Sequence, residues 1–121
     1  MLNGFEKETS ELSSAEIELI PTFISGLSKK VGKKNSITNK AIVQSLKNKG
    51  ISISEPRVRK IINHIRKKGL IDGLIASSNG YYISTDIEEI KAYIDSLYGR
   101  EEAIRIIREG FEAQIRRTYY K

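Results

Sequence analysis

The segment from residue 55 to residue 68 constrains the fold of this chain more than any other. Ser54 before it is a preferred helix N-cap residue, and Gly69 after it is a preferred C-cap residue. Pro56 falls in the first turn, where the missing N–H costs nothing. On a helical wheel, one arc of about 100° collects the apolar side chains of Val58, Ile61, Ile62 and Ile65. The pattern predicts an amphipathic helix whose apolar face enters the core.

The opposite face of this predicted helix is cationic, and Glu55 is its one acidic residue. Arg and Lys hydrogen-bond guanine or contact phosphate, Asn pairs with adenine, and a helix of this width fits the major groove of DNA. The side chains predicted to read that groove are Arg57, Arg59, Lys60, Asn63, His64 and Lys67.

Positive charge is concentrated around this helix. Residues 28–68 contain thirteen Lys or Arg and a single acidic residue, a balance of +12. Residues 1–27 carry −4 and residues 69–121 carry −2, which together give the net charge of +6. A compact basic segment between acidic flanks is typical of a polyanion-binding surface. A solvated lysine-rich face is the alternative interpretation.

Two further helices are predicted before this segment. Ser13 and Glu16 have capping-box spacing and open a helix that ends near Gly32. Pro21 either kinks that helix or marks its true start. Its apolar stripe consists of Ile17, Ile20, Phe23, Ile24 and Leu27.

The second of these helices is opened by Thr38, a good N-cap residue, and is ended by Lys49 and Gly50. Ile37 before it is predicted to form a very short strand. Its expected buried face consists of Ala41, Ile42, Ser45 and Leu46. Free amides and the helix dipole at its N-terminus favour anions, so Lys33, Lys34, Thr38 and Lys40 are expected to hold phosphate there.

After the cationic helix the apolar period becomes that of strands. Residues 74–76 and 81–83 flank Asn79-Gly80, a hairpin signal because both turn residues tolerate positive φ. Alternation along the second strand predicts that one of Tyr81 and Tyr82 packs on the core while the other faces outward. The turn residues Ser78 and Asn79 are expected to make secondary phosphate contacts.

A long C-terminal helix is predicted from residue 86, with Thr85 and Glu88 at capping-box spacing. Gly99 interrupts the register, so that the segment is either one helix bent there or two helices in series. Its distal apolar stripe has too few partners within one small domain, which indicates self-association or docking back on the domain. The apolar positions are Ile87, Ile90, Ile94, Leu97, Ile104, Ile107, Phe111 and Ile115.

The composition argues against several classes of protein. The chain has no Cys and only one His, His64, so neither a disulfide framework nor a usual transition-metal site is expected. It has no phosphate-cradling Gly-rich loop and no nucleophilic Cys, so that no catalytic residues, no cofactor and no enzymatic activity are expected. An acidic leader over residues 1–12, predicted to be flexible, and the lack of a long apolar run favour a cytoplasmic location and no membrane contact.

These features together resemble a known family. The stretches SEPRVRKIINHIRKKG and LIASSNGYYISTDIEEIKAYIDSL are similar to the recognition helix and the wing of winged helix-turn-helix domains found in small bacteriophage and mobile-element proteins. The resemblance covers about residues 17–98, and the turn lacks the Lys or Arg that some wings insert into the minor groove.

The resemblance implies a mainly α fold with a small β-hairpin, in which a winged domain over residues 13–85 precedes a helical extension over residues 86–121. The expected function is double-stranded DNA binding as a transcription regulator of a phage or mobile element, with a homo-oligomer formed through the extension. A non-catalytic adaptor or a DNA-binding component of a phage replication or packaging assembly is the alternative, and RNA binding is a third possibility.

Overall fold

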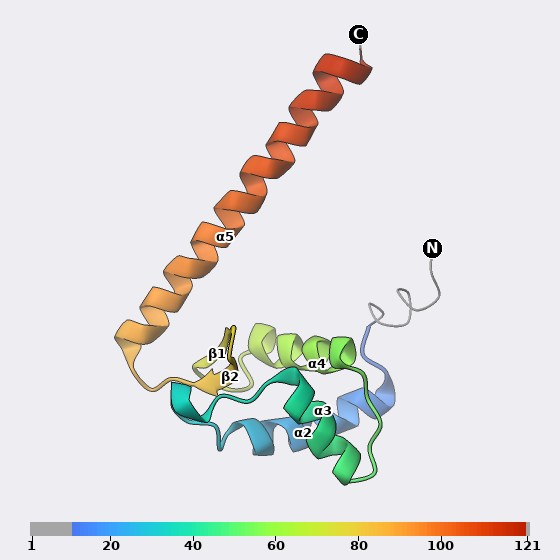
Figure 1. Ribbon diagram of the computed structural model, residues 1–121, viewed down its shortest axis with the longest axis vertical. Coiled ribbons are helices and arrows are strands. Elements are labelled where there is room, and N and C mark those ends of the chain that lie inside the picture. Colours follow the sequence, from blue (N-terminus) through green and yellow to red (C-terminus); the bar gives the residue numbers. More distant parts are fainter. Residues whose placement is uncertain (1–10, 121) are drawn as a thin grey trace. The chain divides into compact units, whose positions relative to one another are not determined.

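The computed structural model describes residues 11–120, which fall into two compact units that meet between Thr85 and Asp86. Among the described residues, the first unit holds three α-helices and an antiparallel hairpin, and the second holds one long helix followed by a short turn (Figure 1). The prediction of a mainly α fold with a small hairpin and a long C-terminal helix is confirmed. Residues 1–10 of the predicted leader lie outside the described residues.

Helix α2 (Ser14–Leu27) begins where the capping box predicts. The Glu16 amide donates to Ser13 Oγ at 3.1 Å, and the Ser13 amide donates to Glu16 Oε1 at 2.8 Å. The helix continues through Pro21, so the proline does not mark its start. Ile17, predicted to be in the buried stripe, is 52% exposed.

The end of α2 was predicted too late, because the chain leaves the helix after Leu27 and becomes extended. The Ile83 amide donates to the Lys30 carbonyl at 2.8 Å, and the Gly32 amide donates to the Ile83 carbonyl at 2.9 Å. Backbone pairing with the hairpin therefore replaces the last helical turn that the sequence pattern predicted.

Helices α3 (Asn39–Asn48) and α4 (Glu55–Lys68) have their predicted bounds. Thr38 and Ser54 cap them by accepting from the amides of Ala41 and Arg57, at 3.1 and 3.4 Å. Both α2 and α3 pack on α4. Ala41 and Ser45 are exposed rather than buried, because only a narrow row of α3 side chains reaches the core.

The hydrophobic core is centred on α4. Its side chains Val58, Ile61, Ile62 and Ile65 are 0% exposed. Around them pack residues from the other elements of the unit: Ile20, Phe23, Leu27, Ile42, Leu46, Leu74 and Tyr81. The apolar face of α4 is thus fully buried in the core, and its opposite face is the one that solvent or a ligand can reach.

Strands β1 (Leu74–Ser77) and β2 (Gly80–Ile83) form the predicted hairpin, in which Ser77 pairs with Gly80. Gly80 has φ of 114°, whereas no non-glycine residue between 11 and 120 has positive φ. Asn79 therefore does not adopt the conformation expected of it. Tyr81 and Tyr82 are both buried, 7% and 5% exposed, so the prediction of one outward-facing tyrosine is wrong.

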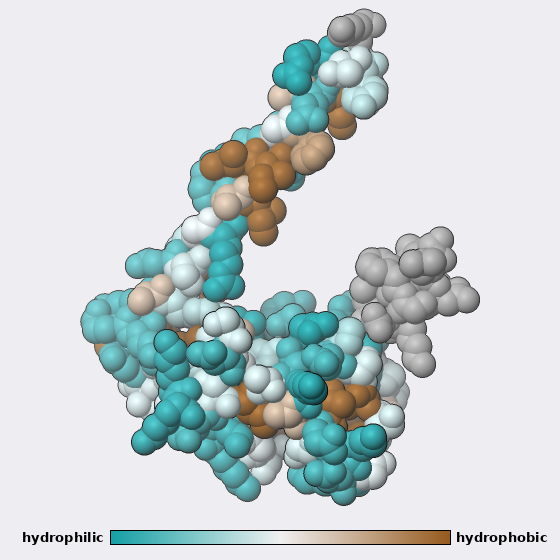
Figure 2. Space-filling model, viewed as in Figure 1, coloured by the Kyte–Doolittle hydropathy of each residue, from teal (hydrophilic) through white to brown (hydrophobic). Residues whose placement is uncertain are grey.

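Helix α5 (Ile87–Gln114) runs through Gly99 without interruption and is followed by a short π-helical turn, η2 (Ile115–Tyr119). The N-cap is Asp86, whose Oδ1 accepts from the Glu88 amide at 2.9 Å, so the predicted Thr85 cap is wrong. None of the residues 87–114 is buried. Figure 2 shows apolar side chains gathered on the distal half of this helix.

Candidate nucleic-acid interface

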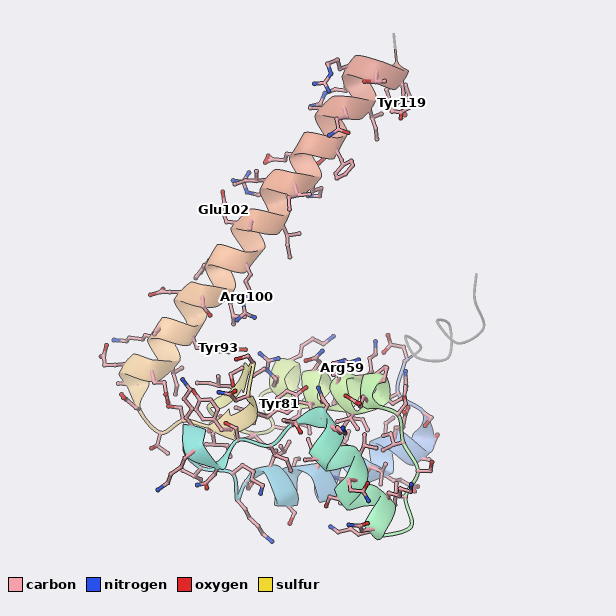
Figure 3. The ribbon with its side chains drawn as sticks, in the orientation of Figure 1. Arg59, Tyr81, Tyr93, Arg100, Glu102 and Tyr119 are labelled. Atoms are coloured by element: carbon pink, nitrogen blue, oxygen red, sulfur yellow. The ribbon has the colours of Figure 1, made fainter. Side chains whose placement is uncertain are left out.

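The outer face of α4 carries a row of exposed polar side chains. Arg59, Asn63 and Lys67 are exposed and follow one another at intervals of four residues, which places them on one side of the helix. Figure 3 shows side chains with nitrogen tips projecting from α4, including the labelled Arg59. With a rise of about 1.5 Å per residue the row is about 12 Å long, which corresponds to three or four stacked base pairs. We call these three residues the α4 row.

Lys60 and His64 lie beside the α4 row and are partly covered. The Lys60 side chain is 34% exposed, and its Nζ lies 3.8 Å from a carboxylate oxygen of Glu11, whose own side chain is 97% exposed. Such a loose, solvated pair contributes little and leaves the ammonium group available to another anion. Asn63 Oδ1 accepts from Arg66 Nη1 at 3.3 Å, which adds Arg66 to the edge of this face.

Arg57 does not belong to the interface, and its prediction as a groove-reading residue is wrong. It is 8% exposed and faces α2. Its Nε donates to Glu16 Oε2 at 2.7 Å, its Nη2 donates to Glu16 Oε1 at 2.5 Å, and Nη2 also donates to the Glu11 carbonyl at 3.0 Å. The hydrogen bonds of the guanidinium group therefore hold the start of α2 against the start of α4.

The Glu16 carboxylate is stabilised strongly in its charged form. Hydrogen bonding from Arg57 is the largest cause, and the Ser13 amide adds to it, so that the pKa of Glu16 falls from 4.5 to about 2 although burial opposes the shift. The same contact raises the pKa of Arg57. This bidentate pair is a structural clamp between helices, which we call the Glu16–Arg57 clamp.

A second group of predicted residues is brought together at the N-terminus of α3. A Cβ placed on Gly80 would lie 2.3 Å from the Ile37 carbonyl oxygen and 2.9 Å from the Thr38 amide nitrogen. Ile37 and Tyr81 exchange backbone hydrogen bonds of 2.9 and 2.8 Å, which confirms the predicted short strand at Ile37. The hairpin turn is therefore held directly against the start of α3.

Four predicted contact residues lie in this neighbourhood and are all exposed: Thr38, Lys40, Ser78 and Asn79. The Thr38 hydroxyl oxygen already accepts from the Ala41 amide. Ser77 organises the turn, because its Oγ accepts from the Asn79 amide at 3.2 Å and donates to the Gly80 carbonyl at 3.1 Å. Tyr81 Oη donates to Asn39 Oδ1 at 2.9 Å and ties β2 to α3 from the inside.

Lys33 and Lys34 are exposed on the short 3₁₀ turn η1 (Lys33–Asn35). The preceding Gly32 is bonded to Ile83, at the end of β2 that lies away from the hairpin turn. The two lysines are therefore placed at the other end of the strand from Ser78 and Asn79. They form a separate basic patch rather than part of the group at the start of α3.

Sequence reasoning missed the second role of Glu16, which is to hold Arg57 away from the exposed face of α4. Glu16 was predicted only as the second member of a capping box, although one carboxylate serves both the Ser13 amide and the Arg57 guanidinium. The spacing of Ser13 and Glu16 predicted only the helix cap. It could not predict the contact with Arg57, because Arg57 is 41 residues away in sequence. Arg66, which donates to Asn63 at the edge of this face, was not among the predicted contact residues.

Comparison with protein-family models, with curated proteins and with solved structures finds no match for this chain. Within residues 11–120, no helix is both long and apolar enough to cross a membrane. In the same range, no group of three or more His, Asp or Glu side chains is arranged to hold a metal ion.

Proposed function

We propose that the first unit is a winged helix-turn-helix domain that binds double-stranded DNA, with α4 in the major groove and the β1–β2 hairpin as the wing. The element order supports this proposal, because helices α2, α3 and α4 precede the hairpin and a short turn joins α3 to α4. The biological role that we propose is transcription regulation in a phage or mobile element.

The observation that carries the proposal is the division of α4 into two faces. Four aliphatic side chains on one face are 0% exposed, while the α4 row is exposed on the other. Arg59 and Lys67 supply cations to phosphate or guanine, and Asn63 between them supplies an amide suited to adenine. Glu55 is the only acidic residue in the helix, so the helix itself places no carboxylate within the α4 row.

Contacts to the DNA backbone are proposed to come from the start of α3. Lys40 and the N-terminal amides of α3 suit one phosphate, and Ser78 and Asn79 on the adjoining turn suit another through hydrogen bonds. Lys33 and Lys34 suit a more distant phosphate. The turn lacks a basic side chain, so the wing is expected to contribute less affinity than α4.

Fluorescence anisotropy with a random-sequence DNA duplex at low salt tests the proposal. Arg59→Gln/Lys67→Gln is expected to weaken binding at least about tenfold and to lower the slope of log K against log salt by about 2, one for each lost cation. The matched control is Lys29→Gln/Lys49→Gln, which removes the same charge from the groove between α2 and α3.

Equal losses in the two double variants would mean that binding depends on net charge alone and would overturn the assignment to α4. Wild-type binding to a structured RNA that survives excess duplex would favour RNA as the ligand. The remaining candidate is a non-catalytic adaptor in a replication or packaging assembly, which the exposed apolar side chains of α5 favour. An adaptor predicts no duplex binding even at low salt.

A further inference from the structure

The distal half of α5 and the first residue of η2 carry large apolar side chains that are exposed in the described part of the chain (Figure 2). Ile104 is 68% exposed, Ile107 60%, Phe111 61% and Ile115 42%. Steps of three and four residues place them within an arc of about 80° on the helix. We call these four residues the distal apolar face. An uncovered apolar patch of this kind marks a site of protein association.

The charges beside this face are already paired within the same helix. Arg105 forms ion pairs with Glu102 and Glu109, and Arg108 forms one with Glu112. Both arginines are therefore paired within about one turn of the same helix, and the charges beside the face are of both signs. A partner of a single charge sign would meet like charges here, whereas an identical helix offers charges of both signs. The charge pattern thus favours a second copy of this chain.

The length of α5 supports the same occupant. None of the 28 residues of this helix is buried, although burial of an apolar face is the main source of helix stability in proteins. Pairing of two identical helices buries the distal apolar face of both, and closed two-fold dimers are the commonest assemblies of soluble proteins.

We infer that α5 pairs with α5 of a second copy through the distal apolar face. The pairing itself does not require DNA. Its consequence for recognition rests on the proposed function: two copies of α4 in one particle would bind two half-sites, and pairing would strengthen binding to a duplex long enough to hold both.

Sedimentation equilibrium of the full chain, without DNA and at micromolar concentration, tests the pairing. The wild type is expected to have twice the mass of one chain, and Ile107→Ser is expected to shift it to the monomer. The matched control is Ile106→Ser, because Ile106 is 59% exposed and adjacent in sequence but points about 100° away from Ile107. This variant is expected to remain a dimer.

If circular dichroism shows that a serine substitution unfolds α5, a second variant tests the pairing. Phe111→Leu keeps an apolar helix-forming residue, and it is expected to raise the dissociation constant at least about fivefold while the helical signal of the monomer is unchanged. A monomeric wild type, or equal weakening by Ile106→Ser and Ile107→Ser, overturns the pairing.

Anisotropy with a long duplex separates this inference from the proposed function. A dimer that does not bind duplex retains the pairing and refutes DNA binding. A monomer whose binding depends on Arg59 and Lys67 refutes the pairing and retains DNA binding. If both hold, Ile107→Ser weakens binding to the long duplex at least about tenfold, whereas Ile106→Ser leaves it unchanged.

Discussion

Helices α4 and α5 both contain several isoleucines, but the surroundings of these side chains are opposite. In α4 the isoleucines are 0% exposed, and the cations of the α4 row face outward. In the distal half of α5, Ile104, Ile106 and Ile107 are 59–68% exposed. Arg105 and Arg108 are paired with glutamates of the same helix. The part of each helix that is left unsatisfied therefore differs: charge in α4 and apolar surface in α5.

This difference is the basis on which we propose two kinds of partner for one small chain. Exposed cations on a helix face that has no carboxylate of its own suit a polyanion, and exposed apolar side chains beside paired charges suit another helix. The same residue type is consequently expected to respond in opposite ways to mutation in the two helices, which the following predictions use.

The largest effect on folding is expected for the core face of α4. Ile62→Ala removes a side chain that is 0% exposed, and it is expected to lower the free energy of unfolding by about 3 kcal/mol, since the cavity adds to the lost burial. Ile106→Ala removes the same atoms from α5 at a position that is 59% exposed and is expected to cost less than about 0.5 kcal/mol. Urea denaturation followed by circular dichroism measures both, and equal costs would abolish the contrast between the helices.

The Glu16–Arg57 clamp provides the next largest effect. Glu16→Gln keeps the shape of the side chain but leaves a buried guanidinium without its counter-charge, so a loss of about 3 kcal/mol is expected at pH 7. Arg59→Gln, two residues along on the exposed face, is expected to cost less than about 0.5 kcal/mol. Thermal unfolding at pH 7 compares the two. A larger loss of stability in Arg59→Gln than in Glu16→Gln would contradict the structural role of Arg57 and favour its prediction as a DNA contact.

The clamp also predicts a dependence on pH. The pKa of Glu16 is about 2 in the folded state and 4.5 ordinarily, so its stabilisation is fully present above pH 4.5 and is lost as the pH falls towards 2. The wild type is expected to lose on the order of 3 kcal/mol more than Glu16→Gln over this range. Parallel stability curves for the two proteins between pH 5 and pH 2 would contradict the clamp.

The smallest effects on stability are expected at two glycines, Gly80 in the first unit and Gly99 in α5. Gly80→Ala is expected to cost about 2 kcal/mol, because φ of 114° is unfavourable for alanine and the new Cβ would meet the Ile37 carbonyl. At Gly99 a Cβ meets no atom of the described chain within 4 Å, so Gly99→Ala is expected to raise the stability of α5 by about 0.5–1 kcal/mol. Thermal melts followed at 222 nm detect both signs. Destabilisation by Gly99→Ala would mean that this side of α5 is already packed.

Local signals were enough to predict α4. Its cap residues, Pro56 and Gly69, act within one turn of the helix ends, and its apolar period is strict, so both bounds are confirmed. The hairpin was likewise predicted from the residues of its turn. Among the site residues, exposure of Arg59, Asn63 and Lys67 followed from the helix period alone.

The remaining features depend on contacts between segments that are distant in sequence. Arg57 is turned inward by Glu16, which lies on another helix, and α2 ends early because Lys30 and Gly32 pair with Ile83. Tyr82 is buried although alternation predicted that one tyrosine faces outward. At the start of α5 the capping-box spacing predicted Thr85, whereas the Glu88 amide donates to Asp86.

The contrast between the two helices is tested most directly by an NMR titration of the ¹⁵N-labelled full chain with a DNA duplex at low salt. The proposal predicts that amide shifts concentrate on α4 around Arg59, Asn63 and Lys67, with smaller shifts at the start of α3 and at the hairpin turn. Amides of residues 104–115 are expected to keep their positions. Shifts confined to α5, with those of α4 unchanged, would contradict the assignment of α4 as the DNA-binding helix.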